Sequence, residues 1–319
     1  MRTENFITLF ITLSFAIYAL FCWHTNLLSA QTKENTKTES ILIASNQAAL
    51  SAVEERNSAG AIFQKSSVRE TAIEKFKDNF NRAMNYNGSN ETLVDYYVPC
   101  IFLVDDDGYY VVYTTTAIGS NNAQYMQNVI TEINTWTRTY GDYTVRYHLS
   151  NTVEIYKGNQ QYSGVYGEAY AHFSTPSQLN FMQDYSTFIE EKDNVICSIM
   201  QNQINYYIST HNDYANTYDK TYTFTMPQIT DFNARLMDAP SIISFAQGIQ
   251  YSTTKGYINV YALTGAIEDE LKMYYEVELN GNLYYHEEGC THVTATEGKK
   301  KSAASCARDG YSPCPYCVR

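Results

Sequence analysis

The longest apolar run of the chain lies at its N-terminus. Residues 6–22 carry no charged side chain, and the run continues through Trp23 to Leu28. About 20 apolar residues cross a bilayer as a helix, so residues 6–28 predict a transmembrane anchor within a first segment, 1–30. Two alternatives stay open. Leu28-Ser29-Ala30 could end a cleaved signal peptide, and a short apolar helix could lie buried in a protein core.

A helical pattern continues after this run. Between Thr32 and Arg56, small apolar residues recur at helical spacing among polar neighbours. We expect segment 31–66 to form a stalk helix and linker, or a helix that packs on the body. An alternative is a pilin-like or secretion-apparatus helix that packs against copies of itself. The residues that form the stripe are Ile41, Ile43, Ala44, Ala48, Ala49, Ala52 and Val53.

Helical and strand patterns alternate over residues 67–270, which predicts an α+β domain. Ser67 and Glu70 have the spacing of a capping box before an amphipathic helix. Residues 121–136 predict another helix, and the Thr175-Pro176 sequence predicts the start of the longest helix in this domain. Alternating or β-branched runs predict strands in this domain at 96–104, 109–113, 143–147, 152–156, 222–226, 241–251 and 256–262, and two more beyond it, at 273–279 and 283–285.

The run Asp105-Asp106-Asp107-Gly108 falls between two of these strands. Asp and Gly are common turn residues, so the run predicts a β-hairpin turn. Calcium binding is an alternative, although the run lacks the alternating ligands and the distal Glu of an EF-hand. His148, His172 and His211 are scattered along the chain, and we expect them to be surface or hydrogen-bonded core residues.

Composition narrows the function classes. A hydrophobic content of 44% excludes wholesale disorder, and a net charge of −12 would repel a phosphate backbone. Thirty tyrosines and few cations favour a body outside the cytoplasm. The sequence has no glycine-rich phosphate loop, no His-Glu-x-x-His and no nucleophile elbow. We therefore nominate no catalytic residue and do not expect an enzyme, with an exported hydrolase as a minor alternative.

The last segment, 271–319, contains the residues that specify a chemistry. Three residues separate His286 from Cys290, Cys314 and Cys317 form a CxxC pair, and a 23-residue loop joins the two pairs. Such spacing is typical of structural zinc sites, because each pair sits on a turn and the loop lets the pairs converge. These four side chains fill a tetrahedral shell and leave no position for substrate. His292 and Cys306 are spare candidates for the same shell.

Other interpretations of this segment stay open. Cys290 could form a disulfide with one cysteine of the CxxC, or the CxxC could be redox-active. The loop is also basic on an otherwise acidic protein. A DNA-engaging accessory protein that uses this tail is therefore an alternative function. The basic residues of the tail are Lys299, Lys300, Lys301, Arg308 and Arg319.

The same segment carries a family resemblance. Tyr285-His286, Cys290, Gly310-Tyr311, Pro313-Cys314 and Cys317 resemble a YHxxxC…GYxPCxxC module at the ends of bacterial secreted and membrane proteins. This module is similar to the metal-binding domain of the Ada DNA-repair proteins. The resemblance covers about 35 residues and implies zinc ligation by His286, Cys290, Cys314 and Cys317. The Ada ligands are four cysteines, so the methyl transfer of that family is not implied here.

The patterns together predict a membrane-anchored α+β protein with a zinc-stapled C-terminal β-hairpin module. A single transmembrane helix would hold the extracytoplasmic body at the cell membrane. The layout loosely resembles components of Gram-positive conjugation or pilus-type assemblies. We therefore expect a structural or interaction component of a bacterial cell-envelope apparatus. Its expected partners are other envelope proteins or copies of itself, and the membrane through residues 6–28.

Overall fold

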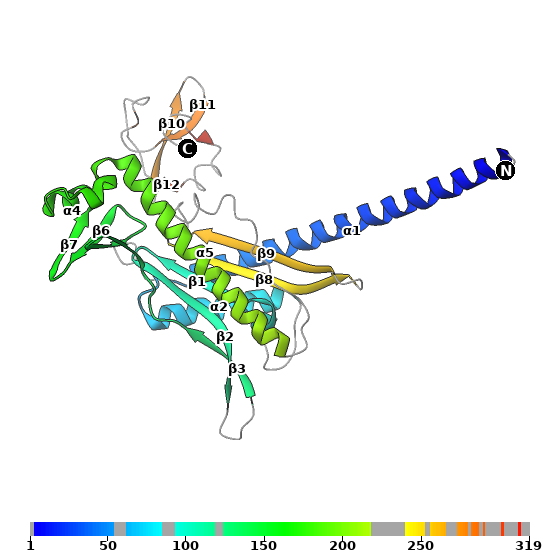
Figure 1. Cartoon of the computed structure of the whole chain (residues 1–319), viewed down its shortest axis with the longest axis horizontal. Helices are drawn as coiled ribbons and strands as arrows, with labels where there is room; N and C mark the ends of the chain where they lie inside the picture. Colours follow the sequence, from blue (N-terminus) through cyan, green and yellow to red (C-terminus); the bar gives the residue numbers. More distant parts are fainter. Residues whose placement is uncertain are drawn as a thin grey trace. The chain divides into compact units, whose positions relative to one another are not determined.

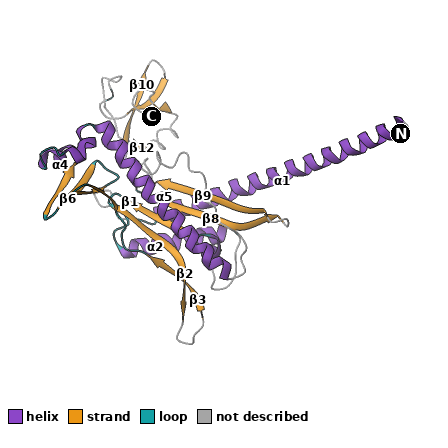
Figure 2. Cartoon of the chain, in the orientation of Figure 1, coloured by secondary structure: helices purple, strands orange, loops and turns teal. Residues whose placement is uncertain are grey.

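The computed structural model describes residues 3–53, 62–84, 93–118, 124–217, 240–252, 256–265, 273–279, 282–286, 290, 301–302 and 312–313. The chain forms two compact units, Met1–Thr264 and Gly265–Arg319. Both helices and strands are well represented, as the sequence patterns predict (Figure 2). The two units are described separately below.

One unbroken helix, α1 (Thr3–Ser51), begins the first unit and spans 49 residues, or about 74 Å at 1.5 Å per residue (Figure 1). Its first half exposes large apolar side chains in every direction around the axis. Among the described residues, α1 is the one helix with a segment long and apolar enough to cross a membrane. The side chains more than half exposed are Phe10, Leu13, Phe15, Ile17, Tyr18, Leu20, Phe21 and Trp23.

The second half of α1 packs on the body, against helix α2 (Ser66–Ala83) and strand β8 (Ser241–Ser252). This half of α1 is therefore a packing helix, so the predicted stalk is not a free helix along its whole length. The apolar stripe predicted from the sequence is only partly the buried face, since Ala49 and Val53 are buried but Ile43 is 37% exposed. Three polar residues complete the buried face: Thr38, Ser45 and Asn46.

A five-stranded sheet forms the centre of the first unit, in the order β3-β2-β1-β8-β9. Strand β1 (Cys100–Asp105) is central and wholly buried, and it pairs antiparallel with β2 (Gly108–Ile118) and β8. The edge strands are β3 (Gln124–Ile130) and β9 (Gly256–Gly265). The helix predicted over 121–136 is wrong, because Gln124–Ile130 pairs along β2 from Ile118 to Val112.

The two faces of this sheet carry different helices. Ser244 of β8 contacts Asn46 of α1, whereas Phe102 of β1 contacts Tyr207 of helix α5 (Tyr185–Thr217) with ring centroids 6.1 Å apart. Ser244 is paired with Ile101, the neighbour of Phe102 in β1. Because successive strand residues face opposite sides, α1 and α5 cover opposite faces of the sheet.

A second antiparallel sheet follows in chain order: β4 (Trp136–Tyr140), β5 (Tyr143–Tyr147), β6 (Thr152–Lys157) and β7 (Gln160–Val165). The two strands predicted at 143–147 and 152–156 are confirmed. Their side chains alternate between buried and half-buried, and the buried face packs in one core with α5 and the short helix α4 (Tyr166–His172). Trp136, Tyr109 and Tyr147 are the largest fully buried side chains of this core.

The helix predicted from Thr175 begins later than expected. A 3-10 helix, η1 (Ser177–Gln183), comes first, and α5 starts at Tyr185. Asp184 separates them, because its Oδ2 accepts hydrogen bonds from the backbone N–H of Ser186 (3.0 Å) and Thr187 (3.2 Å). This is N-capping by a carboxylate, and it places the start of α5 after Asp184.

The first helix of the body and the segment before strand β1 also differ in detail from the prediction. The N-cap of α2 is Lys65, two positions before the predicted Ser67, and the Ser66 hydroxyl bonds Glu70 in place of a backbone cap. A short helix, α3 (Leu93–Tyr97), precedes β1 where a strand was predicted from residue 96. The β1–β2 hairpin is confirmed, with Asp105 paired to Gly108, so Asp106 and Asp107 form the two-residue turn.

The second unit contains a four-stranded sheet in the order β12-β10-β11-β13. The hairpin predicted here is confirmed as β10 (Met273–Leu279) and β11 (Asn282–His286). Strands β12 (Lys301–Ser302) and β13 (Ser312–Pro313) contain two residues each. The strand predicted at 222–226 lies outside the described residues.

Candidate metal centre

His286 occupies the last position of β11, paired with Tyr275 of β10. Its side chain is only 3% exposed although the residue is polar. The imidazole Nδ1 lies 3.4 Å from Sγ of Cys290, which is a free thiol. The structure therefore brings together the first two predicted ligands, His286 and Cys290, at the end of the β10–β11 hairpin.

This distance fits two ligands of one zinc ion. Zinc lies about 2.05 Å from a histidine nitrogen and about 2.3 Å from a cysteine sulfur, and tetrahedral angles then separate the two donors by about 3.6 Å. The observed 3.4 Å between Nδ1 and Sγ is close to that value. The Cys290 thiol is half-buried, so a thiolate here would be partly shielded from water.

Strand β13 leads the chain toward the second ligand pair. It runs parallel to β11, with Tyr284 opposite Ser312 and Tyr285 opposite Pro313. Tyr285 immediately precedes His286, and Pro313 immediately precedes Cys314. The residues before a ligand of each pair are therefore direct partners in the sheet.

The other candidates of this segment cannot be placed in the same way. Cys314 and Cys317 lie outside the described residues, as do His292 and Cys306. Among the residues that the structure does describe, no group of three or more His, Cys, Asp or Glu side chains is arranged to hold a metal. Of the basic loop, Lys301 is described, in β12 opposite Tyr274.

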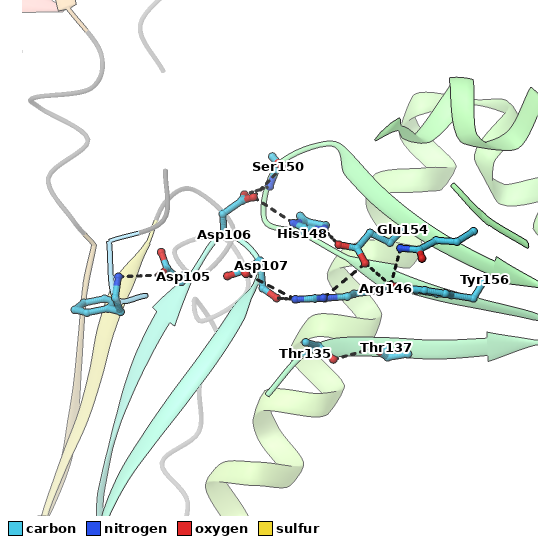
Figure 3. Close-up of polar contacts among 12 residues, drawn as sticks. Asp105, Asp106, Asp107, Thr135, Thr137, Arg146, His148, Ser150, Glu154 and Tyr156 are labelled. Atoms are coloured by element: carbon cyan, nitrogen blue, oxygen red, sulfur yellow. Dashed lines mark hydrogen bonds and ion pairs between the residues drawn. The ribbon is translucent and has the colours of Figure 1, made fainter. Parts of the chain in front are cut away.

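A second polar cluster lies at the β1–β2 turn, which meets the loop between β5 and β6 (Figure 3). Asp106 accepts a hydrogen bond from the Ser150 N–H at 2.9 Å, and its Oδ2 lies 3.3 Å from Nδ1 of His148. Burial favours a raised pKa for Asp106, but its hydrogen bonds with His148 and Ser150 outweigh burial and hold the pKa below its usual value.

Arg146 joins the same turn to β6. Its guanidinium donates to the carbonyl oxygen of Asp107 at 3.0 Å and lies 3.6 Å from Oε2 of Glu154. Glu154 also accepts a hydrogen bond from the Tyr156 hydroxyl, and its Oε1 is 3.5 Å from Nε2 of His148. The cluster therefore contains a guanidinium, an imidazole and carboxylates that contact one another across the joint between the two sheets.

Helix α5 contacts this joint through a buried cation. The Lys192 amine donates to the carbonyl oxygen of Leu149 at 2.6 Å, although the residue is only 3% exposed. Burial lowers the pKa of Lys192, because the charged amine loses its hydration. The amine binds the 149–150 backbone and fixes it beside Asp106.

Asp105 has a different role from its two neighbours. Its carboxylate is fully buried and accepts hydrogen bonds from the backbone N–H groups of Ile62 (2.7 Å) and Phe63 (2.8 Å). Burial raises the pKa of Asp105 to about 6, against the lowering effect of these two hydrogen bonds. Asp105 thus holds the chain before α2 against the end of β1.

Sequence reasoning interpreted the aspartates as turn residues and His148 as isolated. The turn is confirmed, but the contacts of Asp106 with His148 and of Asp105 with Phe63 were not foreseen. These partners lie 42 residues apart in each case. One signal was present, because three consecutive aspartates exceed what a two-residue turn requires. The partners of these aspartates could not be named from the sequence, since they depend on how the second sheet and the chain before α2 pack against the β1–β2 turn.

Comparison with models of protein families, with curated proteins and with solved structures found no match for this chain.

Proposed function

We propose that this protein is a membrane-anchored structural subunit of a bacterial cell-envelope assembly, with its body outside the cytoplasm and a structural zinc site in its C-terminal unit. The observation that supports this proposal most strongly is that α1 is one continuous helix. One helix exposes large apolar side chains over its first half and buries its second half in the body. Because the membrane anchor and the packed segment belong to the same helix, the anchor would be mechanically coupled to the body.

Energetics favour a bilayer around the first half of α1. Moving one large apolar side chain out of water contributes about 1.5–3 kcal/mol. Eight such side chains between Phe10 and Trp23 are more than half exposed. A helix whose apolar side chains point in all directions matches a lipid environment better than a single protein groove.

Membrane anchoring is tested by a matched pair of arginine substitutions in α1. Leu20→Arg places a charge in the apolar half, where it costs about 2.5–3.5 kcal/mol in a membrane helix. Ile43→Arg changes an exposed position in the packed half. Leu20→Arg should move the protein from the membrane to the soluble fraction, and Ile43→Arg should not. Intact mass distinguishes a signal peptide, because cleavage after Ala30 would remove the apolar run.

The assembly role is tested by purification of the intact protein in mild detergent after crosslinking in cells. The expected product is a complex larger than one chain, containing copies of the protein or other envelope proteins. External protease should digest the body in spheroplasts. A strictly monomeric protein with a protected body would contradict the proposal.

The zinc site is proposed at His286, Cys290, Cys314 and Cys317. It is supported by the Nδ1 to Sγ distance of 3.4 Å and by the pairing of Tyr285 with Pro313. Zinc would supply no catalysis here, because four protein ligands fill its tetrahedral shell. His286 and Cys290 would bind it from the end of β11.

Metal content of the purified, freshly reduced chain tests this site. We expect one zinc ion per chain, lost in Cys314→Ser and retained in Cys306→Ser. The second variant is a matched control, because Cys306 is a cysteine eight positions before Cys314 in the sequence but outside the proposed set. Absence of zinc from the reduced wild type would eliminate the site.

A further inference from the structure

Strand β7 is an edge of the second sheet, and its outer side has no partner strand among the described residues. It pairs with β6 at all six of its positions, from Gln160 to Val165, without a bulge. In Figure 1, β7 and α4 lie at the end of the first unit opposite to the N-terminus of α1, so a bilayer around α1 would leave this edge accessible. The exposed side chains of β7 are Gln160, Gln161, Ser163 and Val165.

The direction of the N–H groups in β7 follows from its pairing. The backbone N–H of Tyr166 donates to the carbonyl oxygen of Asn151 at 3.1 Å, one position beyond the paired strands. In an antiparallel pair, hydrogen-bonded positions alternate with positions whose N–H and C=O groups point away. The N–H groups that face the open edge of β7 are therefore those of Gln161, Ser163 and Val165.

This edge lacks the features with which proteins usually block the addition of a strand. Strand β7 contains no charged residue and no proline. The opposite edge of the same sheet differs, because Arg138 of β4 is paired with the buried Val145 and so lies on the core side of the sheet. A charge that points inward from an edge strand disfavours pairing with another chain.

Strand β7 is also held rigidly by its own chain. The Tyr162 ring lies over Gly164, where a Cβ would come within 2.8 Å of that ring. The same ring stacks on His172 of α4, with ring centroids 4.4 Å apart. A strand that is already ordered loses little conformational entropy when it binds a partner.

We propose that β7 is the site at which a second copy of this chain docks, by antiparallel pairing of the two β7 strands across a two-fold axis. The inference names a partner for the assembly proposed above and rests on that proposal. Pairing centred on Ser163 places Ser163 opposite itself and Gln161 opposite Val165 of the partner subunit, so every outward N–H group meets a carbonyl oxygen. A second copy suits this edge because the uncharged strands bring no like charges together.

Disulfide crosslinking of the full chain in detergent tests this register. Facing Cα atoms of a hydrogen-bonded antiparallel pair are about 5.5 Å apart, which a disulfide can span. Ser163→Cys should therefore form a disulfide-linked dimer under mild oxidation, beyond any that the wild type forms. Thr139→Cys is the matched control, because Thr139 is exposed on β4 at the other edge of the sheet, and it should form none.

Ser163→Pro tests the backbone contacts. Proline removes an N–H that faces the open edge and none that faces β6, so the second sheet should fold as in the wild type. The dimer would lose both hydrogen bonds of its central pair, and its dissociation constant, measured by light scattering, should rise at least about tenfold. Ser163→Thr keeps the N–H and should dimerise like the wild type.

The outcomes separate this contact from the assembly role on which it rests. Wild-type complexes that contain other envelope proteins but a single copy of this chain would overturn the inference and leave the assembly role standing. A wild-type chain that stays monomeric and binds no envelope protein would overturn both. A dimer that persists in Ser163→Pro, with no disulfide in Ser163→Cys, would also overturn the inference, because the copies would then meet through another surface.

Discussion

Ser244 of β8 donates a hydrogen bond from its hydroxyl to Oδ1 of Asn46 on α1 over 2.9 Å, and both residues are fully buried. The Asn46 amide in turn donates to the carbonyl oxygens of Ile242 and Ala262, each at 3.3 Å. These bonds connect the helix to two neighbouring strands, β8 and β9. A slip of α1 by one turn would leave all of these buried polar groups without their partners.

Asn46→Leu should lower the free energy of unfolding by roughly 2–4 kcal/mol, because the Ser244 hydroxyl and two carbonyls lose their partner inside the protein. Urea titration of the detergent-solubilised chain, followed by circular dichroism, measures this loss. Ser45→Ala is the matched control. The Ser45 hydroxyl donates to Ile41 in its own helix at 2.8 Å and has one longer contact, 3.3 Å, with Oδ1 of Asn79 on α2, so we expect a loss below about 1 kcal/mol. Equal losses in the two variants would contradict the role of Asn46.

The stability of the protein should depend on pH through Asp105. Burial raises the pKa of Asp105 to about 6 from 3.8, so the folded state holds this proton more tightly than the unfolded state. Its stabilising contribution is complete below about pH 4 and disappears as the pH rises to about 6, by up to about 3 kcal/mol.

Asp105→Asn isolates this effect. The difference in unfolding free energy between wild type and variant should fall between pH 4 and pH 6.5. Asp142→Asn is the control, because Asp142 is exposed in the β4–β5 turn. If the curves for wild type and Asp105→Asn run parallel over this range, Asp105 does not titrate as inferred.

The pair Arg146–Glu154 should contribute more than a shorter ion pair on the surface. Its atoms are 3.6 Å apart, but both side chains are less than a quarter exposed. Arg138 and Glu191 are 3.2 Å apart with Arg138 53% exposed. Double-mutant cycles with Arg146→Met and Glu154→Gln should give a coupling of about 1–2 kcal/mol, against below about 0.5 kcal/mol for the surface pair. The reverse order would show that burial is not decisive.

Zinc affinity should depend on His286 and not on His292. His286→Ala removes a donor that lies 3.4 Å from the Cys290 thiol, so we expect binding at least about 100-fold weaker. His292→Ala should bind zinc like the wild type. Competition with a chromogenic chelator measures both affinities. If His292→Ala shows the larger loss, the ligand set contains His292 in place of His286.

Local patterns predicted elements whose signals are short-range. The β5 and β6 strands alternate buried and half-buried side chains, and the β10–β11 hairpin follows from its two alternating runs. Residues 121–136 show the limit of this reasoning. Their apolar spacing, with Val129 and Ile130 adjacent, fits a helix face, but pairing with β2 provides partners for their backbone in a strand. Tertiary context overrode the pattern.

The buried polar groups could not be predicted for a related reason. Periodicity identifies apolar faces and gives no signal for a buried polar residue such as Asn46, whose partner Ser244 on β8 lies 198 residues away in the sequence. The proximity of His286 and Cys290 was easier to predict, because the two residues are only four positions apart in the sequence. The metal site itself stays a prediction. Its first pair, His286 and Cys290, is brought together in the structure, whereas Cys314 and Cys317 stay a prediction.

Strand β13 also has a consequence for contacts between molecules. It covers the side of β11 that would otherwise present unpaired backbone groups, and such an uncovered edge invites strands from other chains. The replacement edge carries Pro313, whose missing N–H makes it a poor template for a further strand. A strand of two residues thus covers an edge at which other chains could pair, and we expect chains truncated before Ser312 to precipitate at lower concentration than the full-length protein in the same detergent.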